Sequence, residues 1–320
     1  MDNKSRYRAL CAKNPDIPIF SRDWWLDITA GEDNWDVSVV LKNNEIIASL
    51  PYLKRKKYIF NSLEMPKLTP CLGVWIEYPS NQKYTTKLSY EKETFQALID
   101  NLPDFHFFYQ HFHWSVTNWM PFHWQGFIQS TDYTYLIENT QDLEQVFQNF
   151  RENIRREIRK AEKSLTVIEE ENIDAFCSTQ KKTFDRQQMD NPYSPELIRK
   201  LDAACKEIGC RKIWVAIDGS GQIHSAIYVV WDSKAVYYLM GGGDPLLRTS
   251  GAASLLMWNA IKEASKQRKH FDFVGSMFEP IDRFFRGFGA VQMPYLKISK
   301  TNGRLAKFSV LLKEGMKLLR

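Results

Sequence analysis

The feature that most constrains the fold is a three-strand pattern that occurs twice in the chain. Residues 37–66 read as strand, Asn-Asn turn, strand, basic turn, strand and closing proline. Residues 212–245 repeat that order, with a Gly-Ser-Gly turn between the first two strands. Short polar turns between apolar runs are typical of antiparallel hairpins. Two such units, one in each half of the chain, predict duplicated domains of related fold.

The second half adds helices around its strands. Ile154, Ile158 and Ala161 share one face of a charged segment, as expected for an amphipathic helix. We therefore expect a mixed α/β fold, with a largely antiparallel sheet and helices on both faces. The other expected elements are helices at 151–164 and 173–188, a helix beginning near Gly251, strands at 270–276 and 293–299, and a short helix between those strands.

Composition narrows the class of protein. The 320 residues carry a net charge of +5 and a pI near 8.8, which favours acidic small molecules without requiring nucleic acid. The five cysteines form no CxxC pair, so we expect reduced thiols in a cytoplasmic protein. We expect no signal peptide, because the first residues lack its apolar core, and no apolar run approaches about 18 residues. We expect no membrane span and no DNA partner.

A glycine-rich turn gives the clearest candidate site. The segment GGGDPLLRTSGAASLL (241–256) follows an apolar strand and leads into an amphipathic helix. A helix N-terminus offers unpaired backbone N–H groups to an anion. Arg248 adds a full positive charge, and Gly251 removes a side chain where a phosphate would approach. The alternative is a helix start capped by Thr249 or Ser250, with glycines that only turn the chain.

This turn carries a family resemblance. Residues 248–253 (RTSGAA) fit the R/Q-x-x-G-x-G/A loop of the GNAT acyltransferase superfamily, which holds the pyrophosphate of coenzyme A. Residues 151–296 resemble the FemAB-like and BioF2-like branch, and the duplication is similar to the twin GNAT domains of Fem peptidyltransferases. The resemblance implies acyl-CoA as the donor substrate. The implied donor contacts are Met240, Gly241, Gly242, Arg248, Thr249, Ser250, Gly251, Ala252 and Ala253.

The catalytic groups are less clearly marked. Many GNAT enzymes have a tyrosine acid in the short helix where this chain has Phe284 and Phe285. Direct transfer to an amine needs a positioned donor and charge stabilisation, without a covalent enzyme intermediate. Tyr238 or Asp272 are candidate bases, although either can instead be structural. Arg286 is a candidate to stabilise the oxyanion, with a solvated helix arginine as the alternative.

Two further clusters need an interpretation. Four histidines lie in the aromatic block 105–127, but it contains no cysteine, and we expect a half-buried strand and no metal site. Arg156, Lys160 and Lys163 lie on one face of a helix, where like charges repel unless an anion faces them. We expect this basic stripe to bind a phosphate-bearing donor or acceptor, with a solvated face of the helix as the alternative.

We accordingly expect three segments: an acceptor-side GNAT-like domain over 1–138, a donor-binding GNAT domain over 139–300, and a helix over 301–320 that packs back on them. The expected function is transfer of an acyl or aminoacyl group to an amine of a cell-envelope precursor. One alternative is a peptidyltransferase of peptidoglycan precursors that uses aminoacyl-tRNA. The other is a GNAT scaffold that binds a ligand or partner without chemistry.

Overall fold

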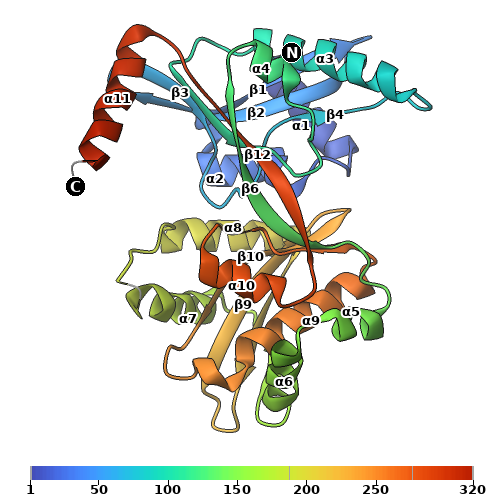
Figure 1. The fold of residues 1–320 in the computed structure, drawn as a ribbon, viewed down its shortest axis with the longest axis vertical. Helices are drawn as coiled ribbons and strands as arrows, with labels where there is room; N and C mark the ends of the chain where they lie inside the picture. The colour runs from blue at the N-terminus through green and yellow to red at the C-terminus, as the bar shows by residue number, and fades with distance from the viewer. Residues whose placement is uncertain (1, 187, 276, 319–320) are drawn as a thin grey trace. The chain divides into compact units, whose positions relative to one another are not determined.

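The computed structural model describes residues 2–186, 188–275 and 277–318 of the chain (Figure 1). These residues form two compact units. The first unit contains residues 1–132 and 294–320, and the second contains residues 133–293. The first boundary lies within strand β6 (Ile128–Ile137) and the second within strand β12 (Val291–Thr301).

The first unit is a mixed sheet with the strand order β1-β2-β3-β5-β12. One core cluster joins α1 to β1, and a second joins α3 and α4 to β2, β5 and β12. The strands are β1 (Trp35–Lys42), β2 (Glu45–Lys57), β3 (Phe60–Glu64), β4 (Trp75–Ile76) and β5 (Phe107–His111). The helices are α1 (Asn3–Lys13), α2 (Asp23–Ala30), α3 (Tyr84–Asp100), α4 (Met120–Trp124) and α11 (Arg304–Leu318), with short 3-10 turns at Ile19–Ser21 and Glu32–Asn34.

The second unit has the strand order β6-β11-β10-β9-β8-β7. All neighbouring strands are antiparallel except β10 and β11, which run parallel. The strands are β7 (Thr166–Glu169), β8 (Arg211–Ile217), β9 (Ile223–Trp231), β10 (Ala235–Gly243) and β11 (His270–Asp272). The helices are α5 (Leu143–Asn149), α6 (Glu152–Ala161), α7 (Ile173–Arg186), α8 (Pro195–Ile208), α9 (Ala252–Lys266) and α10 (Glu279–Arg286), with a 3-10 turn, η3 (Arg248–Ser250), before α9.

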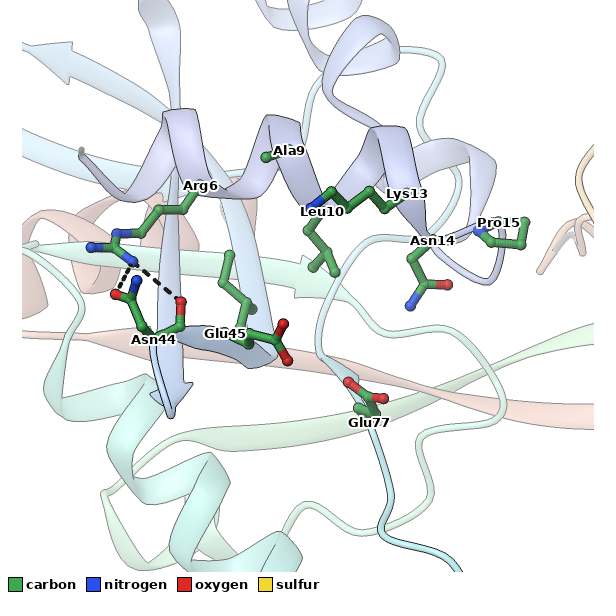
Figure 2. Close-up of a pocket in the computed structure, with 10 residues that line it drawn as sticks. Arg6, Ala9, Leu10, Lys13, Asn14, Pro15, Asn44, Glu45 and Glu77 are labelled. Carbon is green, nitrogen blue, oxygen red and sulfur yellow. Dashed lines mark hydrogen bonds between the residues drawn. The ribbon is translucent and has the colours of Figure 1, made fainter.

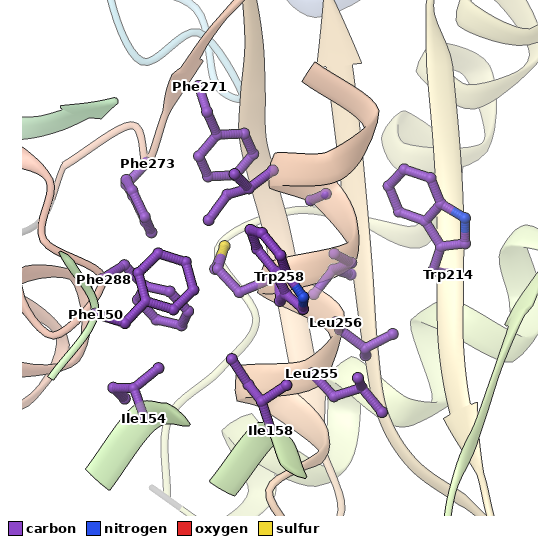
Figure 3. Packing of buried hydrophobic residues seen from close by; sticks show 14 of the residues in the cluster. Phe150, Ile154, Ile158, Trp214, Leu255, Leu256, Trp258, Phe271, Phe273 and Phe288 are labelled. Carbon is purple, nitrogen blue, oxygen red and sulfur yellow. The ribbon is translucent and has the colours of Figure 1, made fainter. Parts of the chain in front are cut away.

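Helices cover both faces of the second sheet. On one face, α6 and α9 pack together, and Ile154, Ile158 and Leu256 are buried with aromatic side chains in a single cluster (Figure 3). On the other face, Phe176 of α7 packs on Tyr228, and the centroids of the two rings lie 5.8 Å apart. The mixed α/β prediction is confirmed, because both three-strand patterns form antiparallel hairpins.

The division of the chain differs from the expected boundaries at 138 and 300. Lys297 to Thr301 of β12 pair with β5, which belongs to the first unit. The chain therefore returns to the first unit before residue 300, and α11 also belongs to it. In α11 Ala306 is fully buried, while Leu305 and Phe308 are exposed. Of these three side chains, Ala306 is the one that packs against other residues. Residues 319–320 of the predicted helix lie outside the described residues.

One strand, β11, is shorter than predicted. The expected strand 270–276 pairs as β11 only over 270–272. Val274 and Gly275 then adopt φ of 61° and 66°, which ends the extended conformation. Ser276 and Gln187, at the ends of two predicted elements, lie outside the described residues. No helix in the described part of the chain is both long and apolar enough to cross a membrane.

Close packing explains why the end of β10 consists of glycines. A Cβ on Gly241 would lie 2.0 Å from the hydroxyl of Tyr238, and a Cβ on Gly242 would lie 2.5 Å from Cα of Gln180 in α7. Thr183 of α7 also donates to the carbonyl of Gly243 at 3.1 Å and accepts from its N–H at 2.9 Å. The glycine run thus lets α7 pack directly on the strand backbone.

We predict that Gly242→Ala destabilises the protein by about 1–3 kcal/mol, because the added methyl group forces α7 away from β10. Chemical denaturation measures this change. Gly219→Ala is the matched control, since a Cβ there meets nothing within 4 Å, and it should change stability by less than about 0.5 kcal/mol. Equal stability of both variants would contradict the packing explanation.

Candidate donor site

The second unit contains a cavity of about 320 Å³ at the end of β10, within the usual range for small-molecule sites. It opens where β10 separates from β11. The two strands pair only from Ala235 to Tyr237 on β10, and the β10–β9 register shifts between Tyr238 and Met240. Its lining comes from the β10 end (Tyr238, Gly241, Gly242, Gly243), the turn and α9 start (Arg248, Ser250, Ala252, Ala253), β9 (His224, Ser225), α7 (Thr183, Arg186) and α10 (Ile281, Phe284).

The start of α9 presents backbone donors to this cavity. The N–H of Ala252 bonds to Oγ of Ser250 at 3.3 Å, and the N–H of Leu255 bonds to the carbonyl of Gly251 at 3.0 Å. Among the described residues, no acceptor is recorded for the N–H groups of Ala253 and Ser254. Such unpaired donors at a helix N-terminus favour an anion.

Two cations lie at the turn before α9. Arg248 lines the cavity and is exposed, and within the described chain its guanidinium has no recorded ion pair. Lys160 of α6 donates from Nζ to the carbonyl of Thr249 at 2.9 Å. Lys160 therefore holds the turn in place, while Arg248 remains available to a ligand.

Gly251 serves this turn in a way the sequence did not indicate. Its φ is +81°, and a Cβ at this position would lie 2.5 Å from the carbonyl oxygen of Glu157 in α6. The glycine is thus needed for the left-handed backbone and for close packing on α6. Neither Gly251 nor Thr249 lines the cavity, and Met240 is buried away from it.

Tyr238 lies in the cavity with its hydroxyl over Gly241. Its ring packs edge-to-face with the ring of Phe285, and the two ring centroids lie 5.9 Å apart. Burial raises the pKa of Tyr238 to about 12. The hydroxyl therefore stays protonated at neutral pH, which makes it a hydrogen-bond donor and a poor base.

Sequence reasoning missed two polar residues at the other end of the cavity. His224 of β9 has Nε2 3.2 Å from Asp218, while its buried Nδ1 has no recorded partner in the described structure. Asp244 bonds to Lys182 at 2.8 Å, and this contact lowers the pKa of the carboxyl group. His224 lines the cavity together with Ser225 and Ile227 of β9, but no local sequence motif marks it.

The remaining predicted catalytic residues do not line the cavity. Asp272 is buried and accepts hydrogen bonds from the Thr134 hydroxyl at 2.6 Å and the Val274 N–H at 2.8 Å. These bonds support the turn after β11. Arg286 is exposed and lies 3.8 Å from Asp282, one turn earlier on α10.

The basic stripe of α6 is also outside the cavity lining. Arg156 and Lys163 are exposed, and Lys160 is the member with a recorded bond, to Thr249. The stripe as an acceptor-binding surface therefore stays a prediction. Among the described residues, no group of three or more His, Cys, Asp or Glu side chains is placed to hold a metal ion.

Comparison with known proteins identifies the class. Residues 148–284 match the model of the acetyltransferase (GNAT) domain. The fold resembles the crystal structure of FemX, with a TM-score of 0.66, 11% identity and coverage of 92% of this chain and 96% of that chain. No curated protein matches the sequence.

Two other solved structures share the fold. A C-terminal domain named for a putative lysylphosphatidylglycerol synthetase, from Agrobacterium fabrum, has a TM-score of 0.55 and 11% identity, and the match covers 97% of this chain and 95% of that chain. A tandem GNAT protein from the clavulanic acid biosynthesis pathway has a TM-score of 0.51, 8% identity and coverage of 94% and 95%. The chain thus has the FemAB-like twin GNAT fold. Residues 148–284 lie almost wholly in the second unit's sequence range, and their match to an acetyltransferase (GNAT) domain supports an acyltransferase activity.

We predict that inorganic pyrophosphate raises the melting temperature of the protein, because it occupies the α9 start. Arg248→Ala should remove most of this shift. Arg304→Ala is the control, since Arg304 is an exposed arginine of the first unit. Calorimetric melting curves measured with increasing pyrophosphate check the prediction, and an identical shift in all three proteins would contradict it.

Proposed function

We propose that the protein transfers an acyl group from acyl-CoA, bound in the second unit, to an amine by direct attack. The observation that carries this proposal is the start of α9, which lies next to Arg248. There the N–H groups of Ala253 and Ser254 have no acceptor among the residues that the structure describes. A diphosphate carries the charge and the acceptor oxygens that these groups require. The cavity from Arg248 to Tyr238 then receives the acyl-bearing arm of the donor.

The chemistry follows from where β10 parts from β11. The backbone of β10 has no partner on β11 beyond Tyr237. Gly243 and the Gly242 carbonyl already bond to Thr183 and Ser225, so the stretch 238–241 is the part of β10 that we expect to meet the amides of an extended donor. The acceptor nitrogen attacks the thioester carbonyl, and the carbon–sulfur bond breaks as the amide forms. The proton that the nitrogen loses ends on the departing sulfur, so the products are the amide and the free thiol of coenzyme A. Charge develops first on the carbonyl oxygen and then on the leaving sulfur.

Tyr238 is our candidate for the group that stabilises this charge. Its protonated hydroxyl lies in the cavity, and it can donate to the oxyanion or protonate the thiolate. It would replace the tyrosine acid that many GNAT enzymes carry on the short helix, where Phe284 now lines the cavity. Asp272 and Arg286 are better explained as structural and solvated groups.

For the acceptor, we propose an amine on a cell-envelope precursor that carries phosphate. The support is the fold shared with FemX and with the domain named for lysylphosphatidylglycerol synthetase. The same likeness supports the second candidate function, in which the donor is an aminoacyl-tRNA. The positive stripe of Arg156, Lys160 and Lys163 would suit the phosphate of either partner.

We predict that Tyr238→Phe lowers kcat by roughly 10²-fold with little change in donor affinity, because only the transition state gains from the hydroxyl. Since the pKa of Tyr238 is about 12, the wild-type rate should not fall through this group as pH rises from 7 to about 10. Steady-state kinetics across pH measure both effects. Tyr237→Phe is the control, because the Tyr237 hydroxyl bonds to Asp232 and does not line the cavity.

The donor is tested by parallel assays with acetyl-CoA and with an aminoacyl-tRNA, using a set of primary amines and amine-bearing sugar nucleotides. We expect transfer from acetyl-CoA that Arg248→Ala weakens. Transfer from aminoacyl-tRNA alone would replace our proposal by the second candidate. Binding of coenzyme A without transfer to any amine would favour a scaffold that has lost its chemistry.

A further inference from the structure

A second cavity, of about 500 Å³, lies beneath α1 in the first unit (Figure 2). Three segments build it. Helix α1 supplies Arg6, Leu10 and Lys13 on one side, the turn into β2 supplies Glu45 and Ile46 on the other, and Glu77 follows β4. The volume is sufficient for a small organic ligand of a few residues.

The backbone keeps this cavity open. Arg6, Leu10 and Lys13 are four and three residues apart, so they lie on the same face of α1. Asn44, with φ of 67°, turns the chain into β2 and accepts from Nη1 of Arg6 at 2.6 Å through its side chain. Glu77 is fixed beside β2 because its N–H bonds to the carbonyl of Ile47 at 2.8 Å.

Side chains of opposite charge line this cavity. Lys13 extends along α1, while the carboxylates of Glu45 and Glu77 lie on the other side (Figure 2). All three side chains are exposed, and within the described part of the chain none of them forms an ion pair with another residue. Leu10 and Ile46 provide apolar surface between them.

We propose that this cavity binds a free amino acid or a short peptide as its zwitterion. The ammonium group would lie at Glu45 and Glu77, and the carboxylate at Lys13 and the amide of Asn14. A polyanion would meet two carboxylates, a simple cation would meet Lys13 and Arg6, and an apolar ligand would cover charges without pairing them. A ligand with both charges satisfies both sides.

This site is independent of the donor cavity. All of its lining residues belong to the first unit, whereas the donor cavity lies in the second. Its occupancy is therefore measurable without donor or transfer, and failure of the proposed function would leave the inference standing. No residue of this cavity takes part in the proposed acyl transfer.

Isothermal titration calorimetry with the full chain tests the proposal. Trialanine is the probe, with N-acetyl-trialanine and trialanine amide as analogues that lack one charge each. We expect trialanine to bind in the millimolar range or better, and each analogue to bind about tenfold or more weakly. Absence of trialanine binding, or equal affinity for all three peptides, would overturn the proposal.

Matched variants assign the two ends of the ligand. Glu77→Gln should lower the affinity for trialanine about tenfold and leave the affinity for N-acetyl-trialanine unchanged. Lys13→Gln should also lower the affinity for trialanine about tenfold, and it should leave the affinity for trialanine amide unchanged. Glu93→Gln and Lys307→Gln are the controls, because both residues are exposed and lie outside the cavity lining. Melting curves verify that each variant is folded. Loss of binding in the controls as much as in the variants would also contradict the assignment.

Discussion

The structure of the second unit depends on the point where β10 stops pairing with β11. Hydrogen bonding between these strands ends at Tyr237, although β10 continues to Gly243 beside β9. A central strand with unpaired backbone is costly unless water or a ligand satisfies it. The cavity lies along β10 beyond this point, and the stretch 238–241 is where we expect a donor to pair with the strand, since Gly243 and the Gly242 carbonyl bond to Thr183 and Ser225. The packing of α7 on Gly242 holds β10 in this position.

The same constraint explains the electrostatics of the site. Helix α9 begins beside the open end of β10, and its first turn leaves two N–H groups without recorded acceptors among the described residues. Glu157 and Lys160 of α6 bind Ser254 and Thr249, respectively. Because α6 holds this turn before any ligand arrives, the site is preorganised, and a bound anion does not have to order the loop.

The sequence predicted the features that local patterns determine. The hairpins, α6, α7 and α9 follow from turn residues and apolar spacing, and the donor loop follows from a motif. Helix α8 was missed although its signals are local: Ser194 caps it by accepting from the N–H of Leu197 at 3.3 Å, and Gly209 ends it in the left-handed conformation. The unit boundary near β12 was not predictable in this way, because it depends on pairing with the distant strand β5.

The roles of individual residues required the structure. Gly251 was expected to make room for phosphate and Gly241 to contact the donor, whereas their missing side chains accommodate α6 and Tyr238, respectively. His224 reaches the cavity from a strand without a motif, and Asp244 lies in the glycine-rich segment but was not singled out there. Tyr238 was expected as a base, but burial raises its pKa to about 12 and makes it a donor. Such facts depend on contacts between segments far apart in the sequence.

The central claim is that the α9 start binds the diphosphate of an acyl-CoA. A crystal structure of the protein with coenzyme A tests it most directly. We expect diphosphate oxygens within hydrogen-bonding distance of the Ala253 and Ser254 N–H groups and of Arg248, with the thiol near Tyr238. Coenzyme A bound elsewhere, or an empty cavity at saturating coenzyme A, would contradict it.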